Sequence, residues 1–273
     1  MNWGTLSRPQ RDASYNNSAA VPNSAEYAPK WLAASAPLRA ARPKLVDIPY
    51  AGKERTKWDL FPAKDAGAPC FVHIHGGYWQ RNSREVFSCM AEGVAAHGWS
   101  AALPGYTLTP DASLTEIVAE LRLALDWLKA NGPEHGIAGP MILTGWSAGG
   151  HLAALLLDHP AIAGGCAISG VYELGPIRDT YLNEKVQLTD LEIETLSPLR
   201  LPQTAKPLTI TYGTRELDAL VQSSRDLHAK RSTLHLPGDL VPATGHDHFT
   251  IMETLRSPTG MLTKCLQRVA EDL

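Results

Sequence analysis

Short apolar runs alternate with amphipathic, helix-like stretches along the chain from about residue 44 onward. Apolar runs of four to eight residues bounded by turn residues predict strands, and apolar positions three and four apart predict helices. Strands that alternate with helices are typical of crossover units, which build a parallel sheet with helices on both faces. The predicted strands cover residues 44–50, 54–61, 68–75, 99–103, 140–144, 162–169, 208–212 and 233–236, and the predicted helices cover residues 84–98, 113–131, 148–157, 219–230 and 249–272.

The beginning of this pattern differs from the rest, because its first two strands are separated only by the turn at residues 51–53. So short a connection predicts a hairpin, and therefore an antiparallel edge on the sheet. The helix at residues 113–131 has the clearest apolar stripe, and Ser113 with Glu116 forms a capping box at its start. The fold class predicted is α/β, with a mostly parallel central sheet, an N-terminal antiparallel hairpin and helices on both faces.

Two segments lie outside the alternating pattern. Residues 1–43 are polar and interrupted by prolines, with one short helix predicted over 24–34, and we expect them to form an arm over the body. Residues 171–205 carry no clear strand signal and are too long for a plain connection, so we expect a cap or lid. Since no repeat or second boundary is visible, residues 1–273 are interpreted as a single domain.

Composition narrows the functional classes. Hydrophobic residues make up 44% and charged residues 19%, and the formal net charge is −3, which is typical of a globular protein without nucleic-acid or membrane partners. The start of the chain has no apolar core like that of a signal peptide, and no run of 18 apolar residues occurs. The four cysteines are far apart, which favours buried free thiols. We therefore expect a cytoplasmic protein.

The stretch Gly145-Trp146-Ser147-Ala148-Gly149 has the pattern G-x-S-x-G between a predicted strand and a predicted helix. Glycines are needed there because the turn is too tight for side chains, and the strained serine is held out at the carboxyl edge of the sheet. Ser147 is thus the predicted nucleophile. The alternative is a glycine-rich turn whose serine only caps the helix.

A serine hydroxyl needs a base, and the base needs an acid that orients it. In this arrangement the acid follows a late strand and the histidine comes last. Glu216 follows the strand at 208–212 and is favoured over Asp218, while His248 is favoured over His246 because Phe249 begins the packed segment after it.

The stretch His75-Gly76-Gly77-Tyr78-Trp79 follows the strand at 68–75. Such a loop can donate backbone N–H groups to a developing oxyanion, together with the N–H of the residue after the nucleophile. Gly76, Gly77 and Ala148 are therefore the predicted oxyanion hole. Tyr78, Trp79, Trp146 and Tyr172 predict an aromatic substrate pocket, and packing is the alternative for them.

Two His-x-His pairs, His73 with His75 and His246 with His248, raise the question of a metal site. His73 lies in an apolar run and His75 belongs to the glycine loop, so we expect neither a metal nor another cofactor.

These motifs together resemble the α/β-hydrolase fold. HGGYW, the segment Tyr106-Thr107-Leu108-Thr109-Pro110, GWSAGG and the late acid and histidine resemble most closely the kynurenine formamidases (arylformamidases) and their bacterial esterase relatives, and Arg11-Asp12-Ala13-x-Tyr15-Asn16 resembles their N-terminal arm. Glu216 departs from that family, in which the acid is usually aspartate.

The resemblance implies a serine hydrolase that forms an acyl-enzyme. Its substrate would be a small acyl compound, either an N-formyl aryl amide such as N-formylkynurenine or a small carboxylic ester. The alternatives are a carboxylesterase without formamidase activity and a non-catalytic ligand-binding protein on a hydrolase scaffold. A homodimer is compatible with the sequence.

Overall fold

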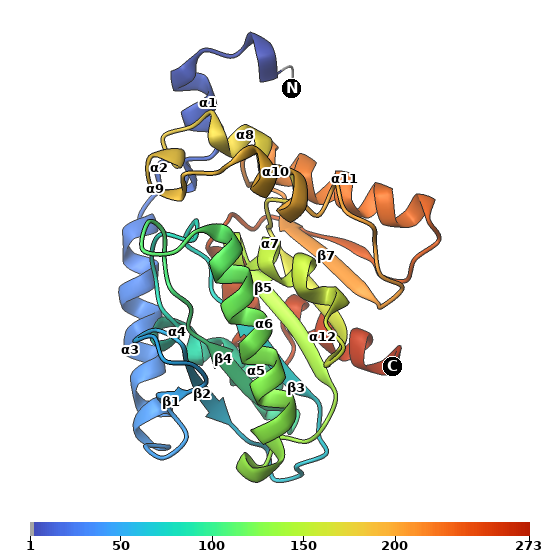
Figure 1. The fold of residues 1–273 in the computed structure, drawn as a ribbon. Helices are drawn as coiled ribbons and strands as arrows, with labels where there is room; N and C mark the ends of the chain where they lie inside the picture. The colour runs from blue at the N-terminus through green and yellow to red at the C-terminus, as the bar shows by residue number, and fades with distance from the viewer. Residues whose placement is uncertain (1–2) are drawn as a thin grey trace.

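The protein is described here from a computed structural model, which covers residues 3–273. Within these residues eight strands form one sheet in the order β1-β2-β4-β3-β5-β6-β7-β8 (Figure 1). β1 pairs with β2, and β2 with β4, in antiparallel fashion, whereas all the other pairs are parallel. The predicted fold class is confirmed, including the antiparallel hairpin. The strands are β1 (Ile48–Pro49), β2 (Lys57–Phe61), β3 (Cys70–Ile74), β4 (Ser100–Pro104), β5 (Met141–Trp146), β6 (Ile162–Ile168), β7 (Leu208–Gly213) and β8 (Leu240–Ala243).

Helices cover both faces of this sheet (Figure 1). Alternate residues of a strand point to opposite faces, and Val72 and Leu143 accordingly belong to one apolar cluster while Phe71 and Ile142 belong to another. The first cluster includes residues of α6, α7 and α11, and the second includes residues of α3, α5 and α12. The helices are α1 (Arg8–Ser14), α2 (Asn17–Ala20), α3 (Tyr27–Ala40), α4 (Arg84–Phe87), α5 (Glu92–Ala96), α6 (Leu114–Asn131), α7 (Ala148–Leu155), α8 (Gly175–Arg178), α9 (Asn183–Val186), α10 (Asp190–Leu196), α11 (Asp218–Thr233) and α12 (Met261–Glu271).

Two sequence-based assignments near the C-terminus need correction. The strand predicted over 233–236 is wrong: α11 continues to Thr233, and the last strand is β8. Leu234 is 51% exposed and His235 has a φ of +54°, so this short apolar run serves the turn after the helix. The single helix predicted over 249–272 is two pieces, a 3-10 helix (Thr250–Leu255) and α12. Pro258 lies between them and interrupts the helix.

The predicted helix over 84–98 is also segmented, into α4, a 3-10 turn (Ser88–Ala91) and α5. By contrast, α6 begins where the capping box predicts it. The Ser113 hydroxyl accepts a hydrogen bond from the Glu116 N–H, and the Glu116 carboxylate accepts one from the Ser113 N–H.

All four cysteines are buried and free, as expected.

The N-terminal arm contributes more to the core than its polar sequence predicts. Trp31 of α3 is only 1% exposed and packs against Phe87 and Trp146, with ring centroids 5.6 and 5.7 Å away. Near the end of α3, Arg39 Nε donates to Asp59 Oδ2 of β2 over 2.7 Å. Since the Asp59 side chain is fully buried, this ion pair ties the arm to the edge of the sheet.

The arm also contacts the segment at 171–205, which consists of short helices above the carboxyl edge of the sheet (Figure 1). The Tyr181 N–H donates to Asp12 Oδ1 over 2.7 Å, and Gln80 Nε2 donates to the Leu182 carbonyl over 2.8 Å. The segment at 171–205 is thus bonded both to the arm, through Asp12, and to the residue that follows the glycine loop, Gln80. Their interpretation as an arm and a lid of one domain stays a prediction.

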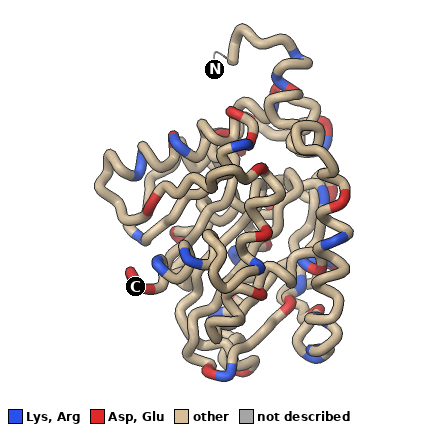
Figure 2. Tube along the Cα trace, turned by 180° about the vertical axis from the view of Figure 1, so that it is seen from behind, with Lys and Arg blue, Asp and Glu red and all other residues tan. Residues whose placement is uncertain are grey.

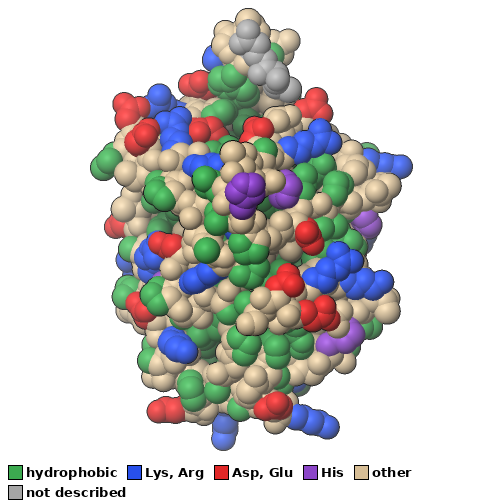
Figure 3. Space-filling view, turned by 90° about the vertical axis from the view of Figure 1, so that its right-hand side faces the viewer, with side chains coloured by type: hydrophobic (Ala, Val, Ile, Leu, Met, Phe, Trp, Pro, Cys, Tyr) green, Lys and Arg blue, Asp and Glu red, His purple; other side chains and the backbone are tan. Residues whose placement is uncertain are grey.

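The charge distribution agrees with the small net charge. Lys and Arg alternate with Asp and Glu along the chain trace (Figure 2). The face seen in Figure 3 carries both signs among scattered hydrophobic side chains. No helix within residues 3–273 combines the length and apolarity that crossing a membrane requires.

Candidate active site

Ser147 lies in the tight turn between β5 and α7. Its backbone has φ +58° and ψ −118°, a strained conformation for a residue with a side chain. A Cβ atom at Gly145 would collide with the Gly149 carbonyl, and one at Gly149 would collide with the Ile74 carbonyl. Both glycines of the motif are thus required by close backbone approach. The Ser147 N–H donates to the carbonyl of Ile168, the last residue of the neighbouring strand β6, over 2.8 Å.

Glu216 and His248 lie together, beyond the carboxyl ends of β7 and β8. His248 Nδ1 is 3.0 Å from Glu216 Oε2, and the two side chains are 4% and 0% exposed. The other carboxylate oxygen, Oε1, accepts hydrogen bonds from the Ser169 hydroxyl and the Gly213 N–H, each over 2.6 Å. Three donors therefore hold the carboxylate in one orientation, and the carboxylate in turn orients the imidazole.

The alternatives considered for the acid and the base lie elsewhere. Asp218 is the first residue of α11 and borders a different cavity. The hydrogen bonds found for His246 involve its backbone: its carbonyl accepts the Arg215 N–H over 2.9 Å, and its N–H donates to the Ala243 carbonyl over 3.2 Å. The structure thus brings the two favoured residues, Glu216 and His248, into contact with each other.

A cavity of about 310 Å³ is bordered by both Ser147 and His248. Among the described residues no hydrogen bond joins the two side chains; in enzymes without bound substrate such hydrogen bonds are often long or poorly aligned and tighten only in the complex. The His248 carbonyl accepts a hydrogen bond from Trp146 Nε1 over 2.8 Å, and the two rings lie 4.9 Å apart. The cavity is lined by Asn17, Ser18, Ser24, Ala25, Ala28, Trp31, Gly77, Tyr78, Arg81, Asn82, Trp146, Ser147, His248 and Phe249.

The loop after β3 approaches the serine turn through its glycines. A Cβ atom at Gly76 would lie 2.5 Å from the Trp146 carbonyl oxygen and 3.1 Å from Ser147 Cβ. Gly77, Tyr78 and Trp79 all have positive φ, +120°, +51° and +59°. Two consecutive residues with side chains in this region, Tyr78 and Trp79, are costly, and such strain often clusters at active sites. No hydrogen bond to another described residue is found for the N–H groups of Gly76, Gly77 and Ala148, and of these three residues Gly77 borders the cavity.

Surrounding hydrogen bonds hold this loop. The Tyr106 hydroxyl donates to the His75 carbonyl over 2.9 Å, and Asn82 Nδ2 donates to the Gly76 carbonyl over 3.1 Å. His75 is buried, stacks on Tyr106 with ring centroids 4.3 Å apart, and has a pKa lowered to about 4 chiefly by that burial. A neutral imidazole therefore braces the loop.

Two of the four aromatic residues predicted to line the substrate pocket do so. Tyr78 and Trp146 border the cavity, whereas Trp79 and Tyr172 are not among its lining residues and are fully buried. For this pair the structure favours packing, the alternative considered from the sequence. Trp79 packs edge-on against His151 at 5.2 Å, and Tyr172 fills the space beside Gly170.

Trp31, Phe249 and Asn17 border the cavity without having been predicted to do so. Asn17 directly follows the arm motif ending at Asn16, and this adjacency was the one signal in the sequence that could have suggested it. Ser169, which donates to Glu216, had no signal beyond its position at the end of a strand.

The two His-x-His pairs have separate structural roles. His73 Nδ1 is 2.8 Å from the Thr144 hydroxyl, and burial lowers the His73 pKa to about 3. Within residues 3–273 no group of three or more histidine, cysteine or acidic side chains has a geometry suited to a metal ion.

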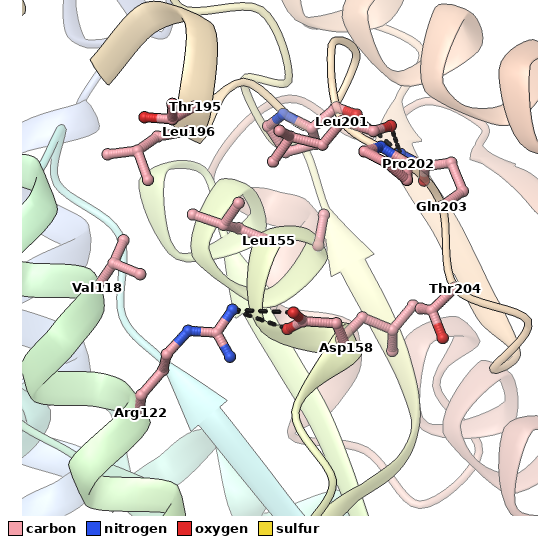
Figure 4. Close-up of a pocket in the computed structure, with 13 residues that line it drawn as sticks. Val118, Arg122, Leu155, Asp158, Thr195, Leu196, Leu201, Pro202, Gln203 and Thr204 are labelled. Carbon is pink, nitrogen blue, oxygen red and sulfur yellow. Dashed lines mark hydrogen bonds and ion pairs between the residues drawn. The ribbon is translucent and has the colours of Figure 1, made fainter. Parts of the chain in front are cut away.

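A larger cavity, of about 510 Å³, lies away from Ser147, between α6, α7 and the end of the segment at 171–205 (Figure 4). Arg122 forms an ion pair with Asp158 across it, with Nη2 2.9 Å from Oδ1. Its lining contains no serine, cysteine or histidine. Its size therefore does not make it the candidate site for nucleophilic chemistry.

Replacing Gly77 with alanine is expected to lower the free energy of unfolding by about 1–3 kcal/mol. The residue has φ +120°, and a Cβ atom would lie 2.9 Å from Asn82 Nδ2 and collide with the Arg81 carbonyl. Urea denaturation measures the change. Gly52→Ala is the matched control, because nothing lies within 4 Å of its added Cβ. Equal stability of the two variants would contradict the strain described for the loop.

Comparison with known proteins agrees with this fold. The family model described as BD-FAE matches residues 59–159. A kynurenine formamidase of Danio rerio is 27% identical over 248 residues, which cover 85% of this chain and 83% of that protein. A crystal structure from Silicibacter sp. TM1040, whose thioesterase assignment is provisional, has a TM-score of 0.83 and 29% identity, covering 94% of this chain and 98% of that one.

Esterase B from Lactobacillus rhamnosis, at 18% identity and a TM-score of 0.71 over 91% of this chain and 95% of that one, shares the fold. The chain therefore has the α/β-hydrolase fold. Within that class it is a formamidase- and esterase-like protein, which supports hydrolysis as its activity.

Proposed function

We propose that this protein is a serine hydrolase that cleaves a small acyl substrate through an acyl-enzyme on Ser147. The observation that carries the proposal is that Ser147 and His248 border one cavity while Glu216 lies 3.0 Å from the far side of the imidazole. A nucleophile, a base and an orienting acid in this order define the reaction class.

In the first half-reaction, His248 removes the proton from the Ser147 hydroxyl as Oγ attacks the substrate carbonyl. Glu216 stabilises the imidazolium that forms. Negative charge develops on the carbonyl oxygen, and the N–H groups of Gly76, Gly77 and Ala148 stabilise it. His248 then gives its proton to the leaving amine or alcohol, which departs and leaves the acyl group on Ser147.

In the second half-reaction, water enters the place of the leaving group. His248 takes a proton from it, and the resulting hydroxide attacks the acyl-enzyme carbonyl. A second tetrahedral intermediate forms at the same N–H groups. Its collapse breaks the bond to Ser147 Oγ, His248 returns the proton to that oxygen, and the carboxylic acid is released.

The cavity favours an aryl substrate with a small acyl group. Its walls include Trp31, Tyr78, Trp146 and Phe249, and at about 310 Å³ it lies at the small end of ligand pockets. The Danio rerio relative carries the name kynurenine formamidase. We therefore propose an N-formyl aryl amide such as N-formylkynurenine as substrate. A small ester is the second candidate, favoured by the esterase structures that share the fold.

Labelling with a fluorophosphonate tests the nucleophile. Intact-mass and peptide mass spectrometry are expected to show one adduct on Ser147 and none in Ser147→Ala. An unlabelled wild-type protein would favour a ligand-binding protein on a hydrolase scaffold. Initial rates on N-formylkynurenine beside short p-nitrophenyl esters then separate the two substrates, and turnover of the esters alone would favour a carboxylesterase.

A further inference from the structure

Asn17 brings an amide side chain from the N-terminal arm to the wall of the serine cavity. It is the first residue of α2, is 4% exposed, and borders the same cavity as Ser147 and His248. The side chain contacts Tyr78 of the glycine loop, but the reaction proposed above assigns it no role. Its hydrogen bonds therefore show what else it can do.

One end of the Asn17 amide is held by Tyr78. The Tyr78 hydroxyl has a single proton, which it donates to the Tyr15 carbonyl over 2.6 Å. Towards Asn17 the hydroxyl must therefore act as an acceptor, and Asn17 Nδ2 donates to it over 3.0 Å. These two hydrogen bonds fix the orientation of the amide, with Nδ2 facing Tyr78 and Oδ1 at the opposite end.

The other end of the amide, Oδ1, has no hydrogen-bond partner among the described residues and is buried. Buried polar atoms are almost always paired, so an unpaired one needs an explanation. Because Tyr78 keeps Nδ2 in place, the side chain cannot turn its oxygen elsewhere without losing that bond. The free protein thus has an unpaired acceptor on a residue that borders the serine cavity.

We propose that Asn17 Oδ1 accepts the N–H of the scissile amide, so that this residue selects secondary amides over the matching esters. The inference rests on the proposed hydrolase function and deepens it by naming the substrate class. An ester has an oxygen in place of the N–H. With an ester bound, Asn17 Oδ1 stays unpaired and faces a lone pair of the ester oxygen. A site built to accept a hydrogen bond from a substrate N–H discriminates against analogues that lack this donor.

Binding to a protein that cannot turn over its ligand tests this directly. In a Ser147→Ala background, affinities for formanilide and phenyl formate, which differ only in N–H against O, can be read within seconds by stopped-flow quenching of fluorescence from Trp31 and Trp146. Adding Asn17→Ala is expected to weaken formanilide binding about tenfold and to leave phenyl formate binding within twofold.

Asn17→Asp separates a direct contact from an effect through Tyr78. It keeps an acceptor oxygen but loses the N–H that Tyr78 accepts. The proposal predicts that Asp retains most of the preference for formanilide, whereas Ala loses it. Ser232→Ala, at an exposed residue of α11 outside the cavity lining, should leave both affinities unchanged.

Equal losses for both ligands, equal effects of Asp and Ala, or no effect of either variant would overturn the assignment of Asn17. The proposed hydrolase function is judged by a different readout, the turnover of phenyl formate by the wild type compared with Ser147→Ala. Turnover that survives the loss of Ser147 would remove the serine mechanism, while the binding comparison would still decide the role of Asn17.

Discussion

Replacing Ser147 with alanine is expected to lower kcat by about a million-fold while the protein remains folded. Without Oγ no acyl-enzyme can form, and the base and oxyanion donors alone accelerate attack by water only weakly. Ser147 is 2% exposed and its hydroxyl has no structural hydrogen bond among the described residues, so its loss should not disturb the turn. Steady-state kinetics on the best substrate of the wild type, with circular dichroism on both proteins, measures the effect.

Ser18→Ala is the matched control for that variant, because it removes a hydroxyl from the wall of the same cavity. We expect its kcat to stay within about twofold of the wild type, because Ser18 belongs neither to the proposed triad nor to the proposed oxyanion hole. A Ser147→Ala protein that retains a tenth or more of the wild-type rate would exclude the acyl-enzyme mechanism.

Replacing Glu216 with glutamine is expected to lower kcat by roughly ten-thousandfold, the scale seen when the orienting acid of such a triad is neutralised. The substitution preserves the shape of the side chain, but a neutral amide stabilises the developing imidazolium far less. Its N–H₂ group can also face His248 Nδ1 and favour the wrong tautomer. The effect should appear in kcat with little change in KM, because the carboxylate lies behind the imidazole and outside the cavity lining.

Asp218→Asn decides between the two acids that the sequence offered. Asp218 starts α11 and borders a separate cavity, so the variant should retain wild-type kinetics within about twofold. A large loss in Asp218→Asn combined with a mild one in Glu216→Gln would reverse the assignment. A loss of the same size in both would indicate instead that the loop after β7 had been disturbed.

Much of the site could be predicted because its signals are local. G-x-S-x-G between a strand and a helix requires glycines on both sides of one strained serine, and the structure shows the collisions that explain both. The close approach of the glycine loop after β3 could also be predicted, because its signal, two glycines directly after a strand, is equally local. The order of strand, acid and histidine further along the chain then placed Glu216 and His248 at the same sheet edge, because parallel strands share their carboxyl ends.

The errors concern features with weak or nonlocal signals. The run at 233–236 is too short for periodicity to distinguish a strand from a turn after a helix. Trp79 and Tyr172 belong to the right region, but an aromatic side chain carries no mark that tells a cavity wall from a packed interior. Whether an aromatic side chain lines the cavity or packs in the interior depends on where it points, and this is set by the residues that pack against it.

By itself, the sequence determined the fold class, the serine turn and the glycine loop, because each follows from patterns within a few residues. The tertiary structure decided which other residues border the same cavity as Ser147. Asn17 and Trp31 come from an arm whose sequence is polar, and they reach Ser147 only because Trp31 is buried against Trp146 and Asn17 is bonded to Tyr78. Contacts between segments far apart in the sequence are set by the packing of the whole chain, so no local pattern records them.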